Sequence, residues 1–229
     1  PRFSPPLDPH FRPAASINRA FREEVLASGA GVPLAFGLER PDGSLSRFET
    51  RVFPQDHPRE GTNIPYAERL LKFLLWQRGA WRVYVGGPRA IGEAIRHSYA
   101  PGGARGFDAR FMGQAVYGRA FTVIACDASQ VPAERESRQA LGRHLDGCRL
   151  GFDLGASDHK VAAVVDGRVV YSHERPWEPV TQSDPNYHYR EIVAALREAA
   201  SHMPRVDAIG GSAAGIYIDN QPRIASLFR

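Results

Sequence analysis

The segment Gly151-Phe152-Asp153-Leu154-Gly155-Ala156-Ser157 decides the fold and begins the functional argument. It predicts a strand that ends in an acidic residue and then turns sharply on a glycine and small residues. Such a hairpin lets backbone N–H groups and the Ser157 hydroxyl approach phosphate oxygens, while the Asp153 carboxylate holds Mg²⁺ through water. The pattern predicts a nucleotide-phosphate site, although an apolar-Asp-x-Gly segment also ends many ordinary strands.

The residues that follow predict an α/β unit. Three strands are expected, at 150–154, 160–165 and 169–173. Asp166-Gly167 is a strong turn signal between the last two, because both residues tolerate positive φ. After a loop through Pro185 comes a helix whose apolar face holds Ile192, Val193, Leu196 and Ala200, and then a strand at 206–209 that ends in Gly210-Gly211.

Residues 149–220 resemble the N-terminal half of the ROK family of sugar kinases. Three pieces carry the resemblance: the first phosphate loop at 151–157, the second strand and turn at 161–167, and a strand with a glycine-bearing loop at 209–219. The resemblance implies actin-like (ribonuclease H-like) ATPase halves, with mixed sheets flanked by helices. It also implies Mg-ATP as cofactor, with Asp153 serving the metal.

Site residues follow from the same resemblance. Those expected at the nucleotide are Asp153, Gly155, Ala156, Ser157 and Lys160, and those expected near the floor of the sugar cleft are Ser212, Ala213, Ala214 and Gly215. The family usually has Gly-Gly-Thr-Lys at this loop. Here Asp158 adds a negative charge, which predicts weaker nucleotide binding unless the carboxylate turns outward or meets a metal.

The function implied is an ATP-dependent sugar kinase, which transfers a phosphoryl group from Mg-ATP to a hexose or hexosamine hydroxyl. The family's catalytic aspartate and second phosphate loop match no residue here. Because the sequence opens with Pro1 and stops at Arg229, we expect a longer product that supplies them. Two alternatives stay open: a non-catalytic sugar sensor or regulator on the same scaffold, and a structural actin-like module.

An upstream unit shows a similar order of elements. Proline-rich residues 1–30 predict an extended arm with a short helix at 17–28. Strands are expected at 33–39 and 44–53, then an amphipathic helix that ends at Gly79, then a strand at 81–87. Asp42-Gly43 and Asp166-Gly167 lie 124 residues apart, as do Gly86-Gly87 and Gly210-Gly211, so an internal duplication is one interpretation.

Residues 31–133 are interpreted either as a degenerate actin-like half or as an accessory α/β domain. Residues 134–147 are expected to form a linker helix, and residues 148–229 to form the nucleotide-phosphate subdomain.

Composition limits the partners and the compartment. The net charge is +4, but no basic stripe interleaved with aromatic residues predicts nucleic-acid binding. No apolar stretch approaches the roughly 20 residues that span a bilayer. Cys126 and Cys148 form no C-x-x-C motif, which favours the cytoplasm. The expected partners are a sugar, the remaining half of the fold from further sequence or another chain, and a second copy of this chain.

Overall fold

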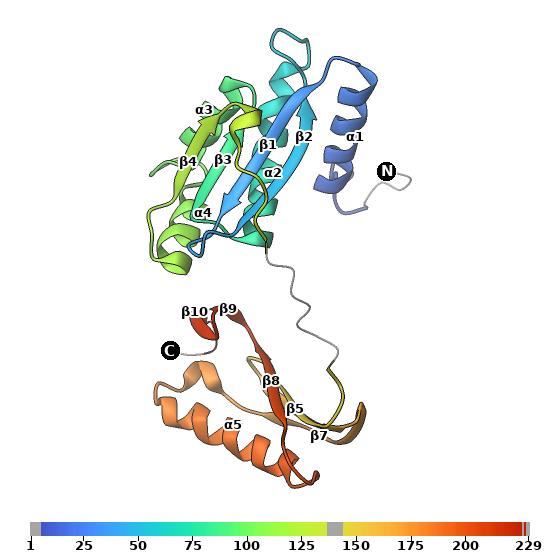
Figure 1. Ribbon diagram of the computed structural model, residues 1–229, viewed down its shortest axis with the longest axis vertical. Coiled ribbons are helices and arrows are strands. Elements are labelled where there is room, and N and C mark those ends of the chain that lie inside the picture. The colour runs from blue at the N-terminus through green and yellow to red at the C-terminus, as the bar shows by residue number, and fades with distance from the viewer. Residues whose placement is uncertain (1–5, 137–143, 226, 228–229) are drawn as a thin grey trace. The chain divides into compact units, whose positions relative to one another are not determined.

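A computed structural model describes residues 6–136, 144–225 and 227 (Figure 1). The chain divides into two compact units, Pro1–Arg138 (unit 1) and Gln139–Arg229 (unit 2). Half of the predicted linker helix at 134–147 falls on residues 137–143, outside the described residues, and the described residues 134–136 and 144–147 are not helical. Beside that gap, Arg135 forms an isolated antiparallel bridge with Leu45, which attaches residue 135 to unit 1.

Unit 1 contains a four-stranded sheet in the order β2-β1-β3-β4. Its strands are β1 (Val32–Glu39), β2 (Leu45–Val52), β3 (Arg82–Gly86) and β4 (Thr122–Cys126). β1 pairs antiparallel with both β2 and β3, whereas β3 and β4 run parallel. The predicted hairpin at Asp42-Gly43 is present, and Gly43 has a φ of 81°.

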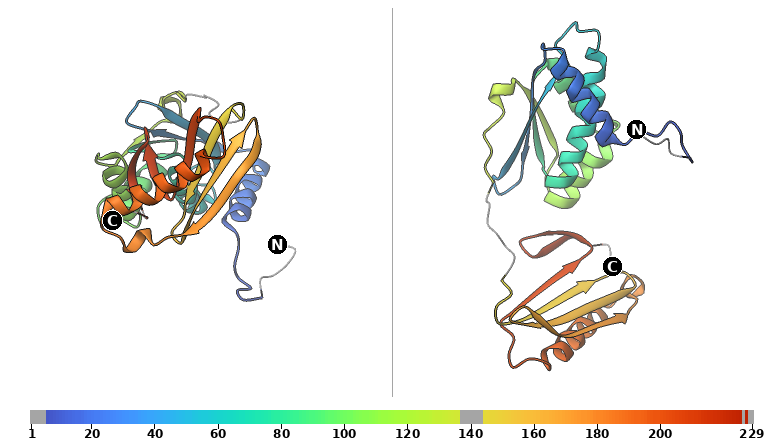
Figure 2. Two further views of the ribbon diagram at one scale, coloured as in Figure 1. Left: turned by 90° about the horizontal axis from the view of Figure 1, so that it is seen from below. Right: turned by 90° about the vertical axis from the view of Figure 1, so that its right-hand side faces the viewer.

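Helices cover one face of the unit 1 sheet, as Figure 2 shows. They are α1 (Ala14–Ala27), α2 (Asn63–Arg78), α3 (Arg89–Ser98) and α4 (Gly106–Arg110), which the π-helix η2 (Phe111–Val116) continues. Unit 1 also has two short 3-10 helices, η1 (Glu60–Thr62) and η3 (Ala128–Gln130). α1 begins three residues before its expected start, directly after Pro13. Phe21 stacks on Tyr66 with ring centroids 4.0 Å apart, so α1 belongs to the unit 1 core and is not a separate arm.

The opposite face of this sheet is covered by the segment that follows β4. Val131 is only 3% exposed, and its side chain fills the space beside the backbone of Gly37 and Gly86. The Arg47 guanidinium donates to the carbonyls of Val131 and Pro132. Both faces of the central strand are therefore packed, and β1 has five consecutive buried residues.

Unit 2 contains a second four-stranded mixed sheet, in the order β7-β6-β5-β8. The strands are β5 (Cys148–Leu154), β6 (Asp158–Val165), β7 (Arg168–Pro176) and β8 (Ala208–Ala213). β5, β6 and β7 form an antiparallel meander, and β8 runs parallel to β5. Asp166 and Gly167 both have positive φ, at 47° and 79°, which confirms the predicted turn between β6 and β7.

Helix α5 (Pro185–Ala200) packs on one face of the unit 2 sheet, after the short turn η4 (Pro179–Thr181). Asp184 caps its first turn, since the carboxylate accepts a hydrogen bond from the Asn186 N–H. One core cluster joins α5 to the sheet through Leu150, Val161, Ala163, Ala195 and Ala199. A two-stranded hairpin, β9 (Gly215–Ile218) and β10 (Gln221–Ala225), follows β8.

The predicted end of the last strand in the unit 2 sheet is corrected by the strand pairing. β8 does not end at Gly210-Gly211, because its parallel pairing with β5 continues to Ala213. Gly211 instead allows close packing, since a Cβ there would lie 2.1 Å from the Phe152 ring.

The predicted duplication is wrong at the level of sheet topology. The 124-residue offset aligns β1 with β6 and β3 with β8 along the chain. In unit 1, however, β3 lies antiparallel beside β1, whereas in unit 2 β5 separates β8 from β6. The residues that the offset assigns to β5, 24–30, include the end of helix α1. Unit 1 is therefore an α/β unit whose sheet topology differs from that of unit 2.

Candidate functional site

Three strands of unit 2 bring predicted site residues together at one end of the sheet. Asp153, near the end of β5, lies opposite Lys160 on β6 and opposite Ser212 on β8. The Ser212 hydroxyl donates a hydrogen bond to the Asp153 carboxylate. Since β5 and β8 are parallel, their carboxyl ends meet at the same edge, where open α/β sheets bind ligands. Residues 59 positions apart in the sequence thus share one site.

The hairpin between β5 and β6 has a two-residue tip, Ala156 and Ser157, and both residues are exposed. The Gly155 N–H donates to the Asp158 carbonyl at 2.9 Å, which closes the turn. A Cβ on Gly155 would lie 2.8 Å from that carbonyl oxygen, so the strands can approach this closely only with glycine at 155. The small residues of the motif therefore make a narrow, accessible tip.

The negative charge of Asp158 is balanced by neighbouring side chains. Its carboxylate forms an ion pair with Lys160 and accepts a hydrogen bond from the Ser157 hydroxyl at 2.9 Å. These contacts, with Lys160 first, hold the pKa of Asp158 below its usual value, and the hydrogen bond to Asp158 raises the pKa of Lys160. The negative charge of Asp158, which was expected to repel phosphate, is therefore paired with Lys160. The same contacts occupy the Ser157 hydroxyl and the Lys160 ammonium group, both of which were predicted to bind the nucleotide.

The sheet face that carries Asp153 and Lys160 is the one opposite α5. On it lies a hollow of ≈ 480 Å³ whose lining includes Gly151, Asp153, Lys160, Ala162, Ser172 and Glu174. Lys160 Nζ also lies 3.8 Å from a Glu174 carboxylate oxygen. Because Gly151 and Ala162 have small side chains or none, the floor of the hollow lies close to the sheet backbone. The charged side chains of Asp153, Lys160 and Glu174 lie at its end.

The four residues predicted at the sugar cleft lie at the end of β8 and the start of β9. Ser212 contacts Asp153, and Ala213 packs with the core cluster of Leu154 and Trp177. Ala214 is exposed. Gly215 has a φ of 152° and lies so close to the Ile224 carbonyl that a Cβ would be 2.2 Å away. The predicted nucleotide and sugar residues are thus adjacent.

The sequence analysis gave Trp177 no part in the site, but its side chain contacts the hairpin. The ring is buried, at 4% exposed, and its Nε1–H donates to the Gly155 carbonyl at 2.8 Å. A second hollow, of ≈ 660 Å³, lies between the hairpin tip and the loop after Trp177, lined in part by Ala156, Ser157, Thr181, Gln182 and Tyr187. The signal in the sequence was the tryptophan directly after a strand, before a proline-containing loop.

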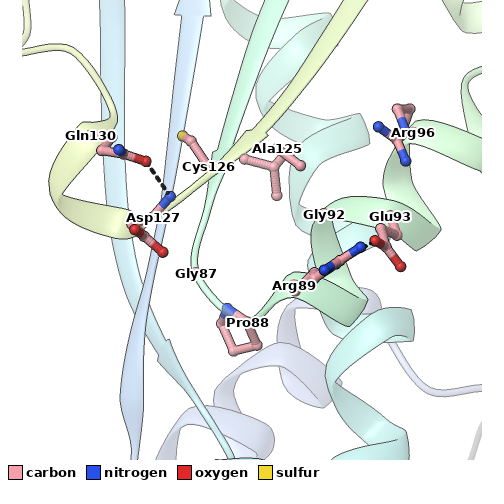
Figure 3. A pocket seen from close by; sticks show the side chains of 11 residues that line it. Gly87, Pro88, Arg89, Gly92, Glu93, Arg96, Ala125, Cys126, Asp127 and Gln130 are labelled. Atoms are coloured by element: carbon pink, nitrogen blue, oxygen red, sulfur yellow. Dashed lines mark hydrogen bonds and ion pairs between the residues drawn. The ribbon is translucent and has the colours of Figure 1, made fainter.

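Unit 1 has a hollow of its own, of ≈ 370 Å³, at the carboxyl ends of parallel strands β3 and β4 (Figure 3). Two pairs of its lining residues bond to each other. Arg89 pairs with Glu93 along α3 at 2.6 Å, and the Asp127 N–H donates to the Gln130 side chain. Its acidic lining residues are Glu93, which pairs with Arg89, and Asp127, which directly follows β4.

The unit 2 site suits Mg²⁺ better than a metal that needs several protein ligands. Within the described ranges, no three His, Cys, Asp or Glu side chains gather into a metal-binding group. Mg²⁺ keeps most of its waters and is commonly held by one or two carboxylates together with substrate phosphates. Asp153, exposed and oriented by Ser212, fits that role with no further protein ligand.

A comparison with protein families matched no family model, and a comparison with curated proteins matched no relative. None of the helices in the described part of the chain has the length and apolar character to cross a membrane.

Proposed function

We propose that the protein binds Mg-ATP at the β5–β6 hairpin of unit 2 and acts in ATP-dependent sugar phosphorylation of the ROK type. The observation that carries the proposal is the convergence of Asp153, Ser212 and the small-residue hairpin at the carboxyl ends of two parallel strands. Phosphoryl transfer needs positioning and charge neutralisation more than covalent chemistry, and this site offers both for the phosphates.

The groups at the site have distinct roles in this proposal. Asp153 holds the metal through its water shell, and Ser212 orients the carboxylate. The exposed amides of Ala156 and Ser157 receive phosphate oxygens. Lys160 adds positive charge beside them while paired with Asp158. A Mg²⁺ ion held at Asp153 would supply positive charge to offset the negative charge of the phosphate oxygens.

The kinase assignment rests on the ROK resemblance, and the fold supports its class. A meander, a helix and a fourth strand parallel to the first are the elements that an actin-like half would provide. The sugar hydroxyl would be bound near Ser212–Gly215, which adjoin Asp153. The proposal assigns the catalytic base to no residue of this sequence. A cytoplasmic location, in keeping with the free thiols of Cys126 and Cys148, is part of it.

A second candidate is a sugar sensor or regulator on the same scaffold. The observation that favours it is the network of Ser157, Asp158 and Lys160, which ties up a hydroxyl and an ammonium group next to the hairpin. Nucleotide binding would then be weak or absent while the sugar cleft remains usable.

Calorimetry with Mg-ADP and Mg-ATP on the chain tests the nucleotide site. The informative pair of variants is Asp153→Asn, at the functional end of β5, and Asp146→Asn, which precedes the other end of the same strand. Asp146 is exposed and contacts Arg149, so its loss should leave binding unchanged. We expect micromolar binding that Asp153→Asn weakens about ten- to hundredfold.

Two other outcomes would decide against the kinase. Absence of binding in the unmodified chain, with binding of a hexose, would favour the sensor. Equal weakening by both variants would show a nonspecific charge effect and would remove the role given to Asp153.

A further inference from the structure

Trp177 contacts the hairpin tip on both sides of Ala156. Its indole Nε1–H donates to the Gly155 carbonyl at 2.8 Å, and its backbone N–H donates to the Ser157 carbonyl at 3.1 Å. Two of the tip's carbonyl groups are therefore held by one residue. Trp177 directly follows β7, whose last residue, Pro176, lies opposite Asp158.

The indole ring is itself fixed by the core. It forms a cluster with Leu154 and Leu227, and His159 meets it edge-on with ring centroids 5.2 Å apart. Tyr187 and His188 of α5 lie on other sides, at 6.5 Å and 6.0 Å. A buried ring with this many neighbours has little rotational freedom, so the position of its N–H is set by the core of unit 2.

Peptide geometry links these contacts to the proposed phosphate site. No cis peptide bond occurs among the described residues, and in a trans peptide the C=O of one residue and the N–H of the next point in opposite directions. Holding the Gly155 carbonyl toward the buried indole therefore turns the Ala156 N–H away from the core. Over the described residues, the N–H groups of Ala156 and Ser157 have no hydrogen-bond acceptor.

We infer that Trp177 is a positioning residue for phosphate binding: it holds the Gly155 carbonyl inward and so presents the Ala156 N–H to phosphate oxygens, while its bond to the Ser157 carbonyl anchors the other side of the tip. The inference rests on the proposed nucleotide site. It adds a residue that does not touch the ligand and that acts only through the orientation of the hairpin. Backbone N–H groups oriented in advance bind an anion without a reorganisation cost.

The test replaces Trp177 by phenylalanine, which keeps an aromatic ring in the core and removes the indole donor. The matched control is Trp76→Phe in unit 1, where the indole donates to Asp108 at 2.7 Å. Two readouts are needed: the Kd of Mg-ADP by calorimetry, and amide hydrogen exchange across unit 2. The expected result for Trp177→Phe is a three- to tenfold weaker Kd, which corresponds to about one hydrogen bond.

Exchange separates positioning from general packing. We expect Trp177→Phe to speed the exchange of the Gly155 amide, which donates to the Asp158 carbonyl, while the centres of β5 and β6 stay protected. We expect Trp76→Phe to change neither readout. Faster exchange throughout unit 2, or an unchanged Kd together with unchanged hairpin exchange, would overturn the inference. Failure of the unmodified chain to bind Mg-ADP would instead contradict the proposed function. That result is seen without the Trp177 variant, so the two failures are distinguishable.

Discussion

Unit 1 and unit 2 both pair a four-stranded mixed sheet with helices on one face, but they treat the other face differently. In unit 1 the segment around Val131 covers the centre of that face, where β1 is buried at five consecutive positions, and a hollow at its edge is lined in part by Arg47 and Glu49. In unit 2 burial along β5 alternates, and the face opposite α5 carries Asp153, Lys160 and Glu174 around a hollow. Similar layers therefore pack a chain segment against the central strands in unit 1 and leave the central strands accessible in unit 2.

Glycine replacements give the largest expected contrast between these faces. A Cβ at Gly86 in β3 would lie 2.3 Å from Val131 and 2.9 Å from backbone atoms, whereas Gly151 in β5 has nothing within 4 Å. Gly86→Ala should lower the unfolding free energy of unit 1 by about 1–3 kcal/mol. Gly151→Ala should leave unit 2 unchanged or stabilise it by up to about 1 kcal/mol.

Denaturant titrations followed by NMR resonances of each unit measure both effects. A loss of stability in unit 2 on Gly151→Ala as large as that in unit 1 would mean that the face opposite α5 is packed, and the contrast would fail.

The two lysines of the chain allow the same substitution to be compared between the units, because each unit contains one. Lys160 pairs with Asp158 on the open face, and Lys72 lies 3.8 Å from Asp108 in unit 1. Lys160→Met should weaken Mg-ADP binding on the order of tenfold, since a charge-assisted contact is lost and the carboxylates remain. Lys72→Met should have no effect on Kd, and Asp158→Asn should strengthen binding. Similar Kd values for all three variants and the unmodified chain would contradict this account.

The smallest expected effect is a pH dependence of the stability of unit 2, caused by a buried histidine. His159 is 3% exposed, and among the described residues its Nε2 has no hydrogen-bond partner, although a Glu191 oxygen lies 4.0 Å away. Burial lowers the pKa of His159 from 6.5, while Glu191 opposes the shift and Arg175 and His173 add to it. Below pH 6.5 the unfolded chain binds this proton more readily, so the stability of unit 2 should fall as the pH drops through that value.

Thermal unfolding of the chain at pH values from 7 to about 5, compared with His159→Gln, measures this effect. The variant should lose much of the pH dependence that appears in unit 2 above the carboxylate range. An equal slope in both proteins would assign the dependence to other groups.

The sequence was sufficient for the local elements and insufficient for their arrangement. Turn signals such as Asp166-Gly167 and the apolar spacing of helix α5 depend on neighbouring residues, and the structure contains both. The strand order depends on pairing between distant segments, and for that reason the equal spacing of the two Gly-Gly pairs suggested a repeat that the sheets lack. Similarly, Asp153 was visible as part of a motif. The contacts of Trp177 with the hairpin were not, because they join residues 22 positions apart.

The most direct test of the central claim is amide chemical-shift mapping of the chain during titration with Mg-ADP. It compares the unit 2 hairpin with the hollow of unit 1 at Arg89 and Asp127 in one experiment. We predict the largest shifts at residues 155–158 and 212–213, with unit 1 resonances unchanged. Shifts centred on residues 87–92 and 126–127, or no shifts at saturating nucleotide, would contradict the assignment of the phosphate site to unit 2.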